Sequence, residues 1–295
     1  MSGRPDARTL AELVRLPAVL SVPGDVVVGA GAVGDTDALK RAVGLAASSS
    51  LLYLAGMALN DYADREEDAR ERPQRPIPSG RVSPGFALGL AGCLTAAAVG
   101  LAGVAGGRRA LRISLPLAAA VWAYDLALKQ TPAGPAAMAL TRGLDVLLGA
   151  SAGPLRRALP AAGVIGAQTL VVTTLSRRET TGATAGFVRG TMAATAGVAA
   201  AAGAVAAGGH GVPAGARATA LGLIGAYAAS VLRAQADAAA DPSPGRLQRA
   251  VGRGIMGLLP LQAGLMAARV PRPVTAAIAA AWPLAQRLSR RKAVT

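Results

Sequence analysis

Apolar stretches of membrane-spanning length recur along almost the whole chain, and this pattern constrains the fold more than any other feature. The hydrocarbon core of a bilayer needs roughly 20 apolar residues in a helix. Backbone N–H and C=O groups find no water there, so only helices or closed barrels can span it. The Ala, Leu, Val and Gly runs lack the alternation of barrel strands. The sequence therefore predicts an all-α, polytopic membrane bundle of about nine transmembrane helices. The predicted helices lie near 11–33, 42–60, 84–105, 109–128, 133–152, 158–175, 187–208, 214–235 and 251–269, with 272–289, interrupted by Pro283, as a candidate tenth.

The composition agrees with a membrane protein. Of 295 residues, 52% are hydrophobic and 16% charged, whereas soluble domains carry about a quarter charged residues. No room remains for a soluble second domain, so we expect a single domain over residues 1–295. The net charge of +15 would suggest nucleic acid in a soluble protein. Here the basic residues lie between apolar stretches, where they set topology and contact anionic lipid headgroups. The expected partner is the lipid bilayer, not nucleic acid.

The distribution of Lys and Arg predicts the orientation. One side of the membrane would hold both termini, the 60–83, 176–189 and 233–253 loops and the 129–132 turn, with 20 Lys and Arg; the opposite turns hold 10. Cytoplasmic loops carry the excess of positive charge. We therefore expect a multi-pass plasma-membrane protein whose 60–83 loop is cytoplasmic.

Five acidic residues fall within positions 60–68, at the end of the predicted second helix. If the helix continues, Asp61, Asp64 and Asp68 lie within about 60° of one another on one face. Three neighbouring carboxylates repel one another unless a cation lies between them. Oxygen ligands suit Mg²⁺, which commonly bridges to substrate phosphates. The alternative is a charged loop neutralised by its own arginines, Arg65, Arg70 and Arg72.

A proline-rich loop follows directly, with the sequence Arg72-Pro73-Gln74-Arg75-Pro76-Ile77-Pro78-Ser79-Gly80-Arg81-Val82-Ser83. Prolines stiffen this loop, and Gly80 allows a tight turn. Arg72 and Arg75 present planar guanidinium groups, which are effective phosphate ligands. Setting the membrane topology is the alternative role for each of them.

The N-D-x-x-D-x-x-x-D cluster at 60–68, followed by R-P-I-P-S-G-R-V-S at 75–83, resembles the UbiA superfamily of intramembrane prenyltransferases, with a pattern closest to its EboC-like branch. Length and helix count agree, so the resemblance covers nearly the whole chain. It implies a helical bundle around a central cavity, and transfer of a prenyl group from an allylic prenyl diphosphate to an often aromatic acceptor, with Mg²⁺. It assigns these residues to the site: Asn60, Asp61, Asp64 and Asp68 in the first aspartate-rich motif, and Tyr124 and Lys129 beside the diphosphate.

The chain departs from the family where a second aspartate-rich motif is expected. That position reads Thr173-Thr174-Leu175-Ser176-Arg177-Arg178-Glu179, with one acid and two arginines. Either Arg177 and Arg178 replace the charge of one metal ion on the diphosphate, or the site has lost ordinary prenyl transfer. Glu179 either completes a single metal site or pairs with an arginine.

Two charges lie inside the predicted fifth helix. Arg142 and Asp145 are one turn apart and could pair; charges at that depth are functional candidates, with a structural ion pair as the alternative. We count Arg142 among the cationic groups around the diphosphate, with Arg15 as a weaker candidate. Two other functions compete with prenyl transfer. One is a non-catalytic protein of the same fold that binds or moves a lipid or metabolite; the other is a cation-coupled transporter that uses Arg142 and Asp145.

Overall fold

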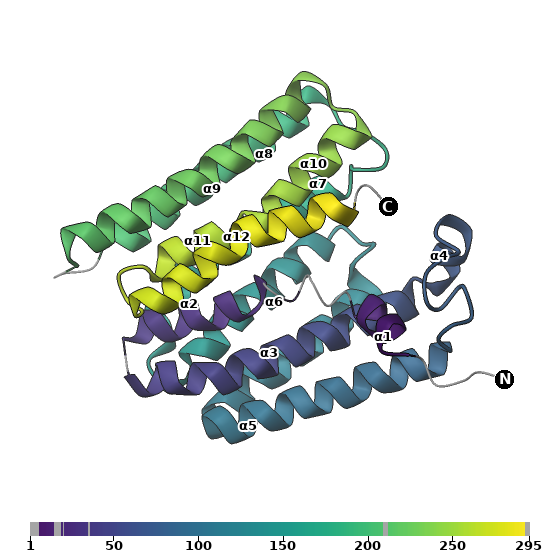
Figure 1. The fold of residues 1–295 in the computed structure, drawn as a ribbon, viewed down its shortest axis with the longest axis horizontal. Helices are drawn as coiled ribbons and strands as arrows, with labels where there is room; N and C mark the ends of the chain where they lie inside the picture. The colour runs from purple at the N-terminus through teal and green to yellow at the C-terminus, as the bar shows by residue number, and fades with distance from the viewer. Residues whose placement is uncertain (1–5, 15–18, 20, 35, 209–211, 293–295) are drawn as a thin grey trace.

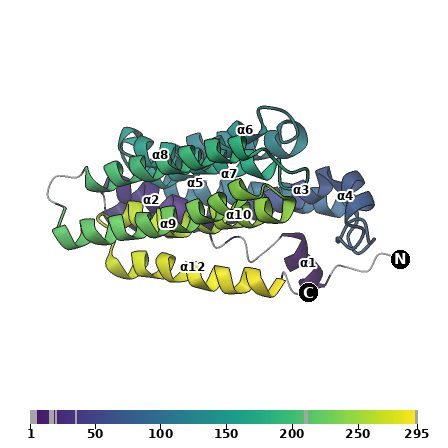
Figure 2. The same ribbon diagram turned by 90° about the horizontal axis from the view of Figure 1, so that it is seen from above.

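The computed structural model is an elongated bundle of helices, in which the long helices run roughly parallel to one axis (Figures 1 and 2). It describes residues 6–14, 19, 21–34, 36–208 and 212–292, and within those ranges it contains helices and no strands. The all-α prediction is thus confirmed. The helices are α1 (Ala7–Leu13), α2 (Pro23–Val33), α3 (Thr36–Ala63), α4 (Arg65–Glu71), α5 (Pro84–Ala123), α6 (Gly134–Gly149), α7 (Leu159–Ser176), α8 (Ala185–Ala207), α9 (Ala214–Ala240), α10 (Pro244–Met256), α11 (Leu258–Met266) and α12 (Arg272–Lys292), with a π-helical turn at Tyr124–Leu128.

Several helices have the length and hydropathy to cross a bilayer. Within the described ranges there are five such segments: Asp37–Ala63, Pro84–Leu128, Leu159–Ser176, Ala185–Ala207 and Ala214–Ala240. A shorter apolar helix spans Pro23–Val33. The chain is therefore a multi-pass membrane protein, while the number of nine spans stays a prediction.

The longest helix, α5, folds back on itself. Gly107 interrupts it with φ 64° and ψ −156°, a conformation that is essentially restricted to glycine. The Trp122 indole N–H then donates to the Thr95 hydroxyl, 27 residues earlier, at 3.0 Å. The two halves are therefore antiparallel neighbours, in agreement with the separate helices predicted at 84–105 and 109–128.

Two predicted helices were wrong in extent. The stretch 11–33 is not one helix, because α1 ends at Leu13 and α2 begins at Pro23; proline restricts the residue before it and favours the first turn of a new helix. The stretch 251–269 is likewise two helices, since α10 begins earlier, at Pro244, and Gly257 separates it from α11. The apolar pattern continues through both breaks and so conceals them.

Helices α2 and α6 cross in direct backbone contact. A Cβ atom on Gly29 would lie 1.8 Å from the Val146 carbonyl oxygen, and one on Gly149 would lie 1.9 Å from the Val26 carbonyl oxygen. Only glycine permits such an approach, and small residues are the usual device for it in lipid. The crossing brings Asp25, one turn before Gly29, toward the polar face of α6.

Candidate functional site

One end of the bundle gathers the loops that carry the predicted site. Helix α4 and the 72–83 loop lie there, beyond the end of α3 (Figure 1). The turn after α5 reaches α4 at this end, because the Gln130 side-chain amide donates to the Glu67 carboxylate at 3.3 Å. The segment after α7 joins them, since the Arg177 guanidinium donates to the backbone carbonyls of Gln130, at 3.1 Å, and Thr131.

The acidic cluster lies where α3 passes into α4. The backbone hydrogen bonds from Asp64 N to Asn60 O, at 2.9 Å, and from Asp68 N to Asp64 O, at 2.8 Å, carry the helical pattern across the junction. Asp61 and Asp68 are only 4% and 3% exposed, although Glu66 points into solvent. Helical hydrogen bonding thus continues past Asp64, which separates α3 from α4, and two of the three predicted ligands are buried.

Arg75 bridges the two buried carboxylates. Its Nη1 atom lies 2.5 Å from Asp68 Oδ2, to which it donates, and 3.6 Å from Asp61 Oδ1. Arg72 Nη1 lies 3.9 Å from the other oxygen of Asp68, but its side chain is 47% exposed, against 20% for Arg75. Arg75 is therefore the principal counter-charge of this carboxylate pair.

The proline-rich loop holds Arg75 in place. The Ser79 hydroxyl donates to the Arg75 carbonyl at 2.6 Å, and Gly80 adopts φ 74°, which favours glycine. Ile77 and Val82 are buried against residues of α1, α3 and α5. The loop is thus anchored by apolar packing at its base and presents its arginines to the acids.

Lys129 neutralises the third aspartate. Its ammonium group forms an ion pair with Asp64, and both side chains are mostly buried. Tyr124, at the start of the π-helical turn, lies within electrostatic range of Asp64. Asn60 donates to the buried Asp125 carboxylate at 3.3 Å. Asp125 was not among the site residues predicted from the sequence. It could have been found as an acid near the end of an apolar membrane helix.

The two arginines of the degenerate second motif diverge. Arg177 lies on the turn that carries Lys129, as described above. Arg178 instead stacks over the Phe187 ring, 5.9 Å from its centroid, and lines a separate pocket of about 630 Å³. Burial raises the pKa of the Glu179 carboxyl, and the positive charge of Arg72 partly opposes this. Arg177 and Glu179 therefore share one end of the bundle with the first motif, whereas Arg178 faces another pocket.

The carboxylates Asp61 and Asp68 fit a cation between them, because one guanidinium nitrogen already contacts both. Their donors are all oxygen, which is the ligand type that Mg²⁺ prefers. Asp64 is engaged by Lys129 instead. Within the described part of the chain, no three His, Cys, Asp or Glu side chains are arranged as a ready metal site. A metal ion would therefore have to displace basic side chains.

Arg142 forms its ion pair with Asp25 and not with its helix neighbour Asp145. Arg142 Nε lies 2.9 Å from Asp25 Oδ2 on α2, and the other Asp25 oxygen accepts from Gln262 on α11 at 2.7 Å. Asp145 accepts from the Ser49 hydroxyl at 2.7 Å. The close α2–α6 crossing explains the exchange of partner. Arg142 thus lies in a polar cluster inside the bundle, and Arg15 falls outside the described residues.

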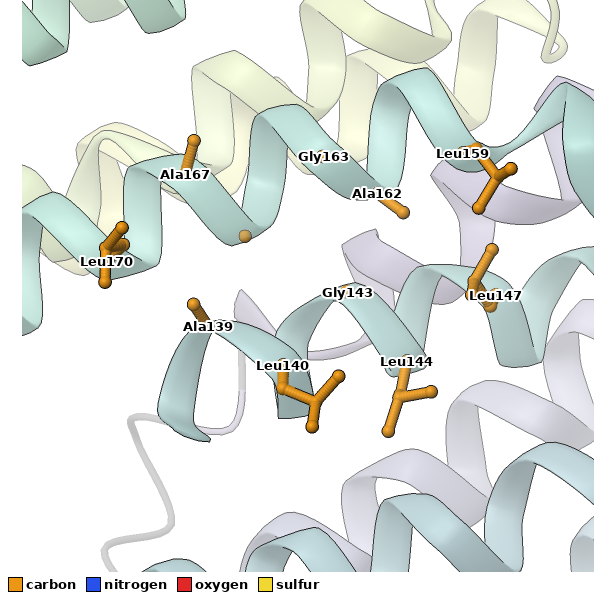
Figure 3. A pocket seen from close by; sticks show the side chains of 11 residues that line it. Ala139, Leu140, Gly143, Leu144, Leu147, Leu159, Ala162, Gly163, Ala167 and Leu170 are labelled. Carbon is orange, nitrogen blue, oxygen red and sulfur yellow. The ribbon is translucent and has the colours of Figure 1, made fainter. Parts of the chain in front are cut away.

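An apolar groove runs along the contact between α6 and α7, which pack closely at Gly143 and Gly166. Its volume is about 410 Å³, and all of its lining residues are Ala, Leu or Gly, including Leu140, Leu147 and Leu159 (Figure 3). These side chains have no polar group and supply packing surface only. The central cavity implied by the family resemblance stays a prediction.

Comparisons with known proteins agree with this arrangement. The sequence profile described as the UbiA prenyltransferase family matches residues 18–243. Among curated relatives, a digeranylgeranylglyceryl phosphate synthase from Methanothrix thermoacetophila is 56% identical over 52 residues, which is 16% of this chain and 20% of that protein. A second synthase of this name, from Halobacterium salinarum, is 35% identical over 147 residues, 49% of this chain and 53% of that protein. The chain thus matches between a fifth and about half of the length of these two relatives.

Solved structures show the same fold. A UbiA homolog from Aeropyrum pernix superposes with a TM-score of 0.64 at 20% identity, covering 84% of this chain and 96% of that one. A UbiA homolog from Archaeoglobus fulgidus bound to GPP and Mg²⁺ superposes with a TM-score of 0.61 at 15% identity, covering 87% and 99%. The relatives' names do not address the EboC-like branch, which stays a prediction.

Proposed function

This chain belongs to the UbiA prenyltransferase family, and from that premise we propose that it transfers a prenyl group from an allylic prenyl diphosphate to an acceptor, with Mg²⁺. The relatives named as synthases support this, as does the family neighbour bound to GPP and Mg²⁺. The observation that carries the proposal is the cluster of acids and bases at one end of the bundle. Lys129 and Arg75 there face Asp64 and the Asp61–Asp68 pair.

In this proposal the acids hold the metal ion and the bases hold the diphosphate. Asp61 and Asp68 are the principal metal ligands, with Asp64 beside them. Mg²⁺, when bound, neutralises the charge that grows on the diphosphate as the C–O bond breaks. Lys129 and Arg72 contribute positive charge at the rim, where charge-assisted hydrogen bonds to phosphate oxygens are strong. No enzyme nucleophile is needed, because the acceptor attacks the allylic carbon directly and then loses its proton.

Arg177 supplies the charge that a second metal ion provides elsewhere in the family. Its backbone position follows α7, but its guanidinium lies on the turn that carries Lys129. A fixed cation aimed at the departing diphosphate stabilises the transition state without reorganisation. Arg178 would contact the diphosphate only from farther away, because its side chain now stacks on the Phe187 ring. The proposed substrate-binding residues also include Asn60, Tyr124, Arg142 and Glu179.

The relatives' name favours a lipid-like acceptor. Digeranylgeranylglyceryl phosphate contains a glyceryl phosphate, whereas the family resemblance of the sequence implied an acceptor that is often aromatic. We propose the glyceryl phosphate class first. The excess of basic residues at this end of the bundle supports a cytoplasmic site.

The test uses membranes that contain the protein, isotopically labelled prenyl diphosphates, and either glyceryl phosphate lipids or aromatic acceptors. We expect a labelled product that forms with Mg²⁺ and is absent with EDTA. Asp64→Ala should abolish turnover, while Glu66→Ala, which removes a solvent-exposed acid two residues before the buried Asp68, should retain it. Binding of the diphosphate without any product would instead favour the non-catalytic alternative.

A further inference from the structure

Resting on the proposed function, we propose that Arg75 holds the position of the metal ion until a diphosphate takes over its guanidinium group. In this scheme Arg75 is a positioning residue with two alternative partners. One is the Asp61–Asp68 carboxylate pair, and the other is the diphosphate. The consequence is that metal and diphosphate bind as a coupled pair, and that the metal alone binds weakly.

The geometry supports a shared position. A single nitrogen atom, Arg75 Nη1, contacts both carboxylates, at 2.5 Å and 3.6 Å. Both of these carboxylates are almost wholly buried. An ion that bridges them must occupy the space that this nitrogen fills. Arg75 and the metal ion therefore exclude each other from the carboxylate pair.

Electrostatics makes the exchange depend on the diphosphate. Two close carboxylates in a partly desolvated site need a positive charge between them, and Arg75 supplies it. A metal ion that enters alone displaces the guanidinium from Asp61 and Asp68, the two carboxylates with which Arg75 forms ion pairs in the described part of the chain. Breaking a buried ion pair by depriving one member of its partner is strongly unfavourable. When a diphosphate enters with the metal, the planar guanidinium gains phosphate oxygens that match its donors.

The loop allows this movement without unfolding. The backbone of Arg75 is fixed by the Ser79 hydroxyl and by the buried Ile77 and Val82. Its side chain is 20% exposed, so it has access to the open side of the site. Only side-chain torsions need to change, while the loop keeps its place.

The experiment measures Mn²⁺ binding to purified protein in detergent, without diphosphate, by electron paramagnetic resonance. We expect Arg75→Gln to bind Mn²⁺ roughly tenfold more tightly than the wild type, within the usual range of such couplings. Arg75→Lys should fall between them, because its shorter side chain keeps the positive charge but brings it less close to the two carboxylates. Arg70→Gln is the matched control: it removes the same charge from exposed α4, where the Arg70 guanidinium donates to the Glu66 backbone carbonyl at 3.2 Å.

A second measurement tests the other half of the exchange. Geranyl diphosphate is titrated at saturating Mg²⁺ and without acceptor, so that no turnover occurs. Arg75→Gln should weaken this binding roughly tenfold, while Arg70→Gln should leave it unchanged. Thermal unfolding of each variant establishes that it is folded, and Arg75→Lys decides the question if Arg75→Gln does not fold.

The outcomes separate this inference from the proposed function. If the wild type makes product but neither Arg75 variant binds Mn²⁺ more tightly than Arg70→Gln, Arg75 does not hold the metal position and the inference alone is overturned. If the wild type binds neither Mn²⁺ nor geranyl diphosphate, separately or together, both proposals fail. Tighter Mn²⁺ binding with weaker diphosphate binding supports the exchange.

Discussion

Replacing Arg142 by methionine should destabilise the fold strongly at neutral pH. The substitution keeps most of the side-chain volume but removes the guanidinium that lies 2.9 Å from Asp25. Asp25 has no exposed surface, so water cannot replace the lost partner. Gln262 still donates a hydrogen bond to one Asp25 oxygen. The Asp25 carboxylate therefore keeps this hydrogen bond but loses the positive charge of Arg142.

Two estimates of the cost agree. Removal of one member of a buried ion pair typically costs about 3–5 kcal/mol. The stranded carboxylate can also take up a proton, which for an ordinary aspartate pKa near 3.9 costs about 4 kcal/mol at pH 7. The loss should therefore be about 3–4 kcal/mol at pH 7. Since protonation becomes easier as the pH falls, it should decrease to about 2 kcal/mol near pH 5.5.

The assay is reversible unfolding in mixed micelles by SDS titration, followed by circular dichroism, at pH 7 and at pH 5.5. Asp25→Asn combined with Arg142→Met should recover more than half of the lost stability, because residue 25 then carries no charge that needs the guanidinium. Arg109→Met is the control, since exposed Arg109 donates to the Ala152 backbone carbonyl at 3.3 Å, and it should cost less than about 0.5 kcal/mol. A loss below about 1 kcal/mol for Arg142→Met, or one that does not change with pH, refutes the reasoning.

Three further predictions follow from other parts of the molecule. Gly107→Ala should cost about 1–3 kcal/mol in the same unfolding assay, because the turn needs a conformation open to glycine, while Gly100→Ala in the same helix should be nearly neutral. Burial raises the pKa of Glu179, so its ionisation opposes folding; Glu179→Gln should raise the thermal midpoint at pH 7.5, with the gain vanishing as the pH falls below about 4. A cysteine at Glu66, in a Cys93→Ala background, should react with an impermeant maleimide in inside-out but not right-side-out vesicles; the reverse pattern contradicts a cytoplasmic site.

The fold was predictable where a single physical requirement decides it. Hydrocarbon demands internally paired backbone, so the apolar stretches had to be helices. The reversal in α5 was also predictable, because Gly106-Gly107-Arg108-Arg109 interrupts the apolar pattern. The breaks before Pro23 and at Gly257 were not, since apolar residues continue across them and the interruption depends on packing against other helices.

Charge partners were harder to predict than the charges themselves. Arg142 and Asp145 are neighbours on one helix, and sequence spacing favoured them as a pair. The actual partner, Asp25, is distant in sequence and arrives through the backbone contact of Gly29 and Gly149. The signal was present, because an aspartate in an apolar helix requires a partner, but sequence alone does not say which helix supplies it.

Stability of the fold does not explain why acids are present at the end of α3. Buried ion pairs seldom add net stability, because desolvation offsets the attraction, and apolar packing already anchors this region through Ile77 and Val82. The fold therefore does not require the pairs that Arg75 and Lys129 make with the acids. If the cluster serves ligand binding, the double substitution Asp64→Leu with Lys129→Met, which removes both members of this mostly buried pair, should lose turnover without lowering the free energy of unfolding by more than about 1 kcal/mol. A parallel loss of stability and turnover would instead make the cluster a structural element.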